Sequence, residues 1–190
     1  MVELKNLTKS YDEKIIFDNF SYTFADTGLY AVVGESGRGK TTLLRIIAHL
    51  EDSKKGSVKS PKKIAFSFQE YRLFDQLDVY SNIESVAFRK PSENDKSLIL
   101  SYLKRLGLSD CAASYPSELS GGMRQRVSLI RAFVCDASVV LLDEPFKELD
   151  PELIHTVVEI IQELSQKKLV IYTSHSEEDA LRIGAQIVKL

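Results

Sequence analysis

The sequence contains little cysteine, no long apolar run and almost no net charge. The two cysteines, Cys111 and Cys135, fit no short metal-ligand spacing, so we expect both to be reduced thiols. No apolar run approaches the roughly 18 residues that a membrane-spanning helix needs. Charges at Glu3, Lys5 and Lys9 leave no apolar core for a signal peptide. We therefore expect a soluble chain, which another protein would have to hold at any membrane.

The charges nearly balance. The 25 basic and 27 acidic residues give a net charge of −2 at pH 7, and without a basic excess we expect no nucleic-acid partner. A hydrophobic fraction of 44% and a charged fraction of 27% over 190 residues are ordinary for a globular protein. These values exclude a disordered chain, a collagen-like fibre and a disulfide-stapled miniprotein. They predict one compact domain over residues 1–190.

Hydrophobic patterning divides the chain into three parts. The first third carries short β-patterns, the middle has helical spacing, and the last third alternates apolar strands with helices. The predicted strands lie at 20–24, 29–33, 56–59, 63–68, 139–143, 169–173 and 186–190, and the predicted helices at 41–50, 79–88, 94–106, 123–134, 151–167 and 177–183. This alternation predicts an α/β fold whose parallel sheet is covered on both faces, with a helical insertion in the middle.

A glycine-rich loop follows the predicted strand at 29–33. Residues 34–41 read GESGRGKT, which satisfies the pattern G-x-x-x-x-G-K-[ST]. The glycines allow backbone N–H groups to approach phosphate oxygens, and the next helix directs its positive end at the same anion. Lys40 reaches the outer phosphates, and the Thr41 hydroxyl suits Mg²⁺. We predict that the phosphates of a nucleotide are bound by Gly34, Glu35, Ser36, Gly37, Arg38, Gly39, Lys40, Thr41 and Thr42.

A second acidic element completes this site. The run VVLLDEP at 139–145 is a predicted buried strand that ends in two carboxylates. Asp143 at the strand tip suits a contact with Mg²⁺, direct or through water. Glu144 suits a general base that polarises the attacking water. Together with the phosphate loop, this strand predicts a P-loop NTPase.

Further motifs resemble those of the ATP-binding-cassette (ABC) ATPases. Residues 119–126 read LSGGMRQR and are similar to the family's signature motif. Gln69 in FSFQEYRLF resembles the Q-loop, residues 148–150 resemble the D-loop, and His175 in IYTSHS resembles the switch histidine. Tyr11 resembles the aromatic residue that stacks on adenine. The resemblance extends from about Val2 to Leu190.

The resemblance implies a fold and an assembly. The fold is α/β, a P-loop NTPase with a mostly parallel core sheet, an N-terminal antiparallel β subdomain and an inserted α-helical subdomain. The core would comprise about 1–70 and 136–190, and the helical subdomain about 71–135. Two cassettes would pack head to tail around two nucleotides, as a homodimer or a heterodimer. Ser120, Gly121 and Gly122 of one subunit would then meet the γ-phosphate that the other binds.

The resemblance also implies roles for single residues. Tyr11 would stack on adenine, and Gln69 would reach Mg²⁺ or the attacking water. His175 would hydrogen-bond the γ-phosphate and orient that water, while Asp150 would organise the subunit interface.

Two features depart from the family pattern. Lys147 and Glu148 stand where the D-loop usually has the small residues Ser-Ala, so we expect altered dimer contacts or side chains that point to solvent. The chain also ends at the strand after the helix that follows His175. We therefore expect a minimal importer-like cassette with no appended regulatory domain.

The predicted function is ATP hydrolysis that powers solute transport through a separate transmembrane permease subunit. The protein would be cytoplasmic and peripheral on the inner face of the cell membrane. The runs FQEYRLFDQLDVYSNI and DEPF resemble those of cassettes that serve small anions, sulfonates or related solutes. One alternative is a soluble ABC ATPase of DNA repair or translation, although repair relatives carry a long coiled coil and translation relatives carry two cassettes. A second alternative is a small phosphotransferase, but the motif LSGGMRQR has no role in such an enzyme. A third is a nucleotide-dependent interaction module with little turnover, and the presence of Glu144 and His175 argues against it.

Overall fold

The computed structural model describes residues 1–86 and 93–190 and contains two sheets. Five strands form a wholly parallel sheet in the order β5-β6-β7-β3-β8. Their bounds are β3 (Gly28–Val33), β5 (Ile64–Ser67), β6 (Val139–Leu142), β7 (Leu169–Ser174) and β8 (Gln186–Lys189). The predicted parallel core sheet is therefore confirmed, and β3 and β6, which precede the phosphate loop and the acidic pair, both end at its carboxyl edge.

The second sheet is antiparallel, as the resemblance implied. It has the order β2-β1-β4, with bounds β1 (Val2–Tyr11), β2 (Lys14–Phe24) and β4 (Lys55–Lys59). Only the second half of β2 was predicted from its alternation. The first half lacks a clean alternation because the pairing with β1 shifts register at several points, and Asn6 and Asn19 adopt positive φ angles of 51° and 56°.

Two hydrophobic clusters cover the two faces of the parallel sheet. Along β3, Tyr30 and Val32 join a cluster with the antiparallel sheet and with α1 (Lys40–Ile47). Leu29 and Ala31 point to the opposite face and join a cluster with α4 (Gly121–Val134), α5 (Pro151–Ser165) and α6 (Glu177–Arg182). The period of two along a strand places neighbouring residues on opposite faces, which is why this strand is apolar throughout.

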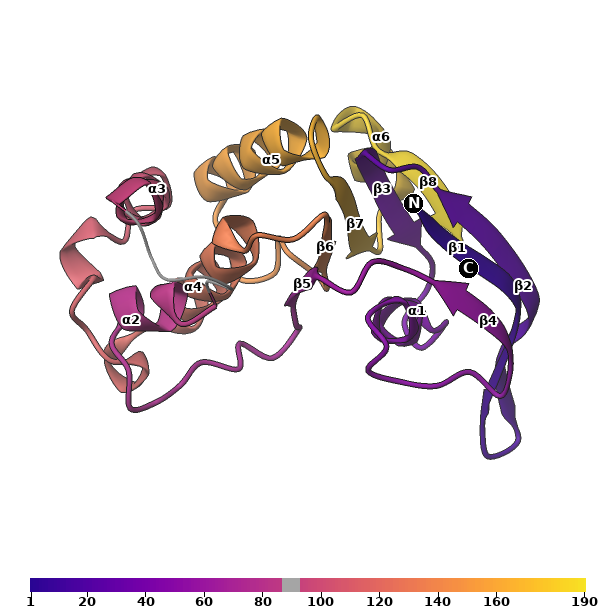
Figure 1. Cartoon of the computed structure of the whole chain (residues 1–190). Coiled ribbons are helices and arrows are strands. Elements are labelled where there is room, and N and C mark those ends of the chain that lie inside the picture. Colours follow the sequence, from indigo (N-terminus) through magenta and orange to yellow (C-terminus); the bar gives the residue numbers. More distant parts are fainter. Residues whose placement is uncertain (87–92) are drawn as a thin grey trace.

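Further helices lie between β5 and β6 in the chain. They are α2 (Val79–Glu84), α3 (Glu93–Arg105), two short 3₁₀ turns at Ser109–Cys111 and Pro116–Glu118, and α4. In Figure 1, α2 and α3 occupy the end of the molecule opposite the antiparallel sheet. The helix predicted at 79–88 ends at Glu84, and its last two predicted positions lie outside the described residues. No helix in the described ranges is long and apolar enough to cross a membrane.

Candidate nucleotide site

The phosphate loop lies between β3 and α1, at the carboxyl edge of the parallel sheet. Gly37 and Gly39 have φ angles of 74° and 99°, a region that residues with a Cβ atom rarely adopt. A Cβ atom on Gly39 would also collide with Ile16 and lie 3.1 Å from the Phe17 ring of β2. Glycine at position 39 is therefore required both by the turn and by the antiparallel sheet packed against it.

Lys40 is folded back over this loop. Its Nζ atom donates hydrogen bonds to the carbonyl oxygens of Gly34 at 2.7 Å and Glu35 at 3.0 Å. The side chain is buried, and burial lowers the pKa of Lys40, while the nearby Glu144 and Asp143 carboxylates act in the opposite direction. The ammonium is thus held by the carbonyl oxygens of the loop, where it would face an anion bound to the loop.

The two acids follow β6 and are oriented by a residue that sequence reasoning missed. The hydroxyl of Thr173, at 1% exposure, donates to Asp143 Oδ1 at 2.8 Å and accepts from the backbone N–H of Glu144 at 2.8 Å. Thr173 is near the end of β7, the strand beside β6, so the sheet itself sets this contact. Glu144 has a φ angle of 52°, an uncommon value outside glycine, and the Thr173 bond helps to fix it.

Three polar side chains from distant positions meet next to the acidic pair. His175 Nε2 lies 3.1 Å from Glu144 Oε1, and its Nδ1 lies 3.4 Å from Lys40 Nζ. Gln69 Nε2 donates to Glu144 Oε2 at 3.3 Å. Because an ammonium only donates, the Lys40 contact requires an unprotonated Nδ1, so Nε2 carries the proton and donates to Glu144. The predicted motifs around these residues are therefore adjacent in space.

These side chains border a cavity of about 360 Å³. Its lining combines the phosphate loop and α1 with Gln69, Glu144 and His175, and the predicted residues in it are Tyr11, Ser36, Gly37, Gly39, Lys40, Thr41, Thr42, Gln69, Glu144 and His175. Lys14 and Ile16 also line the cavity and were missed, because the sequence shows no motif there. Their position just after Tyr11 could have indicated a place near the cavity, but only if the reversal of the chain at residues 12–13 had been predicted.

Tyr11 is held at the cavity by its hydroxyl group. The hydroxyl donates to Glu51 and lies 3.3 Å from Thr42 Oγ1, while Glu51 forms an ion pair with Lys9 at 2.8 Å. Burial alone would raise the pKa of Glu51, but the hydrogen bonds from Lys9 and Tyr11 outweigh it, so the pKa is lowered. Tyr11 is 44% exposed, and the Lys9 ammonium lies over its ring, 5.0 Å from the centroid, so a ligand would meet the other face of the ring.

The signature residues lie elsewhere. Ser120 caps the N-terminus of α4, where its Oγ accepts a hydrogen bond from Met123 N at 3.3 Å. Neither Ser120 nor the two glycines after it line the cavity of their own chain. Glu148 from the D-loop covers these glycines. A Cβ atom on Gly121 would collide with its carboxylate, and one on Gly122 would lie 2.7 Å from its carbonyl oxygen.

The Glu148 side chain is anchored rather than pointing freely to solvent. Tyr71 Oη donates to its carboxylate at 2.5 Å, and this hydrogen bond raises the pKa of Tyr71. The contact joins residues 77 positions apart, between the segment after Gln69 and the D-loop. Glu148, the acidic residue that departs from the family pattern, therefore occupies the space beside Gly121 and Gly122.

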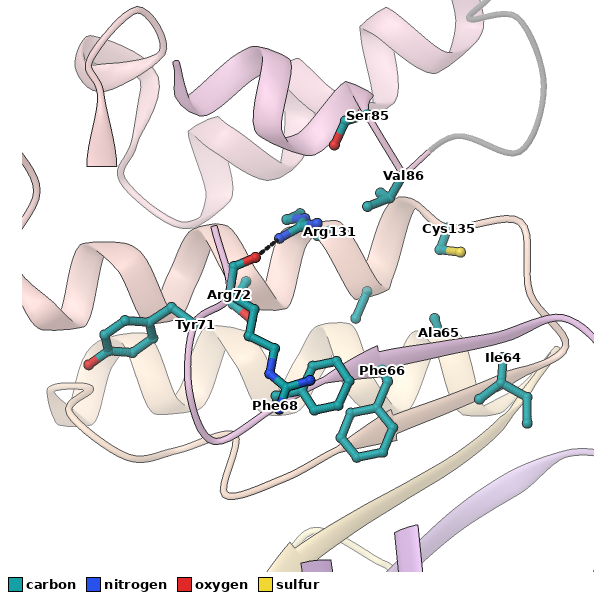
Figure 2. A pocket seen from close by; sticks show the side chains of 12 residues that line it. Ile64, Ala65, Phe66, Phe68, Tyr71, Arg72, Ser85, Val86, Arg131 and Cys135 are labelled. Atoms are coloured by element: carbon teal, nitrogen blue, oxygen red, sulfur yellow. Dashed lines mark hydrogen bonds between the residues drawn. The ribbon is translucent and has the colours of Figure 1, made fainter. Parts of the chain in front are cut away.

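A second cavity, of about 280 Å³, is mainly apolar and lies between β5 and α4 (Figure 2). The rings of Phe66 and Phe68 stack with centroids 4.1 Å apart, and the Arg72 guanidinium lies 3.9 Å from the Phe68 centroid. Arg131 Nη1 donates to the carbonyl oxygen of Arg72 at 2.6 Å. Among the described residues that line this cavity there is no acid–base pair, whereas the polar cavity holds Lys40, Glu144 and His175 and is the candidate for phosphate chemistry.

A phosphate loop at the edge of a parallel sheet, with an acidic strand two positions away, defines a P-loop NTPase. The comparisons with known proteins name the group within that class. Residues 17–147 match the family described as ABC transporter. The chain belongs to this family.

Curated relatives align along nearly the whole chain. The spermidine/putrescine import ATP-binding protein PotA of Pasteurella multocida is 32% identical over 100% of this chain and 55% of its own length. The sulfate/thiosulfate import ATP-binding protein CysA of Acinetobacter baylyi is 34% identical over 98% and 58%. The chain thus spans little more than half the length of these relatives. The probable amino-acid import ATP-binding protein YxeO of Bacillus subtilis is 30% identical over 99% and 84%.

Solved structures share the fold. The dimeric post-hydrolysis state of the ATP-binding cassette MJ0796, bound to ADP and Pi, superposes with a TM-score of 0.89 at 28% identity and covers 100% of this chain and 94% of that one. An ATP-binding subunit of an ABC transporter superposes with a TM-score of 0.91 at 22% identity. The mixed α/β architecture is therefore that of ABC cassettes.

Proposed function

We propose that this chain binds ATP in the 360 Å³ cavity and hydrolyses it to power solute transport through a separate membrane-spanning partner. The observation that carries the proposal is the meeting of Lys40, Glu144 and His175, from three separate motifs, at one end of this cavity. A cation for the phosphates, a base for water and a histidine to orient it are what phosphoryl transfer to water requires.

The phosphate loop would hold the nucleotide with its backbone N–H groups. We assign this role to Gly34, Glu35, Ser36, Gly37, Arg38, Gly39, Lys40, Thr41 and Thr42. Tyr11 would stack on the adenine. Glu144 would accept the proton of the attacking water, and His175 would turn the Nε2–H that contacts Glu144 toward the γ-phosphate when nucleotide is bound.

The oxygen donors in the cavity fit a Mg²⁺ ion. Thr41 and Gln69 line the cavity, and the Gln69 nitrogen is the atom that contacts Glu144, so the Thr41 hydroxyl and the Gln69 oxygen are available. The buried Asp143 carboxylate lies outside this lining, and it would act on Mg²⁺ through a water molecule. Within residues 1–86 and 93–190, no group of three or more His, Cys, Asp or Glu side chains could hold a metal. Mg²⁺ characteristically keeps several water ligands and takes phosphate oxygens, so few protein donors are required. When bound, Mg²⁺ would neutralise charge on the transferring phosphate.

A second ABC subunit would complete the site. Ser120, Gly121 and Gly122 lie outside the cavity of their own chain but present a helix N-terminus, which favours anions. We propose that they contact the γ-phosphate held by the partner, with Asp150 at the interface, in a homodimer or a heterodimer. The similar cassette MJ0796 is described as dimeric.

The membrane partner would be a permease, and the chain would bind to it at the inner face of the cell membrane. The relatives named above are import ATP-binding proteins for polyamines, sulfate or thiosulfate, and amino acids, at 30–34% identity. We propose import of a small solute on that basis. Gln69 links the nucleotide site to the segment around Tyr71, and the helices of about 71–135 would pass the movement of the closing dimer to the permease.

Two experiments test this function. Purified protein should release phosphate from ATP, and Glu144→Gln should abolish turnover while ATP still binds. Glu152→Gln, a charge-matched change at an exposed position of α5, should leave the rate unchanged. Undiminished hydrolysis by Glu144→Gln would overturn its assignment as the base.

A tagged pull-down from detergent-solubilised membranes tests the transport claim. Recovery of a stoichiometric multi-span protein supports it. Recovery of only soluble partners would instead favour a soluble ABC ATPase.

A further inference from the structure

Lys14 enters the nucleotide cavity from the antiparallel sheet. It begins β2 and pairs directly with Tyr11 at the end of β1, across a two-residue turn. Asp12 in that turn has a φ angle of 48°, which allows the tight reversal. Both Tyr11 and Lys14 line the cavity. The residue proposed to stack on adenine and this lysine are therefore held by one hairpin.

The Lys14 ammonium lies on the phosphate loop itself. Its Nζ atom donates to the carbonyl oxygen of Gly37 at 3.1 Å. In the part of the chain that the structure describes, no carboxylate neutralises Lys14, and this carbonyl is its hydrogen-bond acceptor. An ammonium has three donors, so two remain for a ligand in the cavity.

Lys14 and Lys40 come from different structural elements and differ in how many contacts their ammonium groups make. Lys40 belongs to α1, is buried, and is held by two carbonyl oxygens and His175. Lys14 comes from the other sheet and is exposed, with one carbonyl contact. The two ammonium groups thus approach the loop from different elements of the fold, and a triphosphate lying in the loop carries enough negative charge for both.

We propose that Lys14 is a nucleotide-binding residue whose ammonium contacts phosphate oxygens of ATP from the β1–β2 hairpin. The assignment rests on the proposed ATP-binding function of this cavity. If the proposal is correct, the positive charge of Lys14 contributes directly to ATP affinity. The hydrogen bond from Lys14 to the Gly37 carbonyl, which supports the loop, does not by itself explain that contribution.

Three substitutions separate charge from loop support. Lys14→Gln keeps a donor for the Gly37 carbonyl but removes the charge, Lys14→Arg keeps both, and Lys14→Met removes both. Lys104→Gln is the matched control, since Lys104 is an exposed lysine on α3. Thermal melts of each variant establish that it folds.

The measurement is the dissociation constant of a fluorescent ATP analogue with Mg²⁺ at several salt concentrations. Lys14→Gln and Lys14→Met should weaken binding by about three- to tenfold, in the range expected for an exposed charge-assisted contact. They should also reduce the dependence of affinity on salt. Lys14→Arg and Lys104→Gln should stay within about twofold of the original protein.

The outcomes distinguish a direct contact of Lys14 with phosphate from support of the loop and from no role in binding. If Lys14→Gln binds as tightly as the original protein and only Lys14→Met is weaker, Lys14 merely supports the loop and the proposal fails. If all Lys14 variants bind normally, the residue has no part in binding. If the unsubstituted protein itself does not bind ATP, the proposed function fails first, and that result is distinguishable from a failure of Lys14 alone.

Discussion

Replacing Tyr172 by phenylalanine should stabilise the protein. Tyr172 is fully buried in β7, and within the described residues its hydroxyl has no hydrogen-bond partner. Burial raises the pKa of this group, so the hydroxyl stays protonated and uncharged throughout the physiological range. A buried polar group without a partner has lost its hydrogen bonds to water and gained nothing in exchange.

The magnitude follows from that imbalance. An unsatisfied buried hydroxyl costs about 1–3 kcal/mol. Tyr172→Phe removes it and leaves the ring, which packs edge-on against Phe146 with centroids 5.7 Å apart. We therefore expect the free energy of unfolding to rise by about 1–2 kcal/mol. For a chain of this length, each kcal/mol corresponds to about 2–4 °C in Tm.

The assay is thermal and chemical denaturation of Tyr172→Phe beside Tyr30→Phe. Tyr30 is also buried, but its hydroxyl accepts a hydrogen bond from the backbone N–H of Ala25 at 3.3 Å. The same atom is deleted in both variants, so their stabilities should change in opposite directions, with Tyr30→Phe losing about 0.5–1.5 kcal/mol. A fall in Tm for Tyr172→Phe would refute the reasoning.

Three further predictions concern the nucleotide site. Thr173→Val frees the acidic pair from its shared hydroxyl and should lower kcat by about tenfold or more while ATP affinity changes little, measured by steady-state phosphate release and by nucleotide titration. Gly39→Ala should destabilise the protein by about 2–4 kcal/mol, from its φ angle of 99° and the collision with β2, and denaturation curves check this. The lowered pKa of Glu51 means that its contribution to stability is complete above its ordinary value of 4.5 and is lost as pH falls through the folded-state value. The stability difference between the original protein and Glu51→Gln should therefore shrink below about pH 4.5 in denaturation curves recorded at a series of pH values.

Local patterns in the sequence were enough to predict the class of protein. The phosphate loop, the acidic strand end and the apolar strands between helices are each encoded within about ten consecutive residues, and each depends on backbone geometry that a short segment sets by itself. The parallel sheet followed from the alternation of elements, whereas the expectation that His175 acts together with Lys40 and Glu144 came from the resemblance to ABC ATPases.

Tertiary structure alone decided the contacts that orient these groups. Thr173 bonds residues about 30 positions away, and Tyr71 reaches Glu148 across 77. Glu51 holds Tyr11, and Lys14 lies on the carbonyl of Gly37. None of these pairs forms a pattern along the chain, because each joins two segments whose approach is set by sheet order and register. Motifs are local and can be recognised in the sequence, whereas the side chains that position them are specified only when the chain has folded.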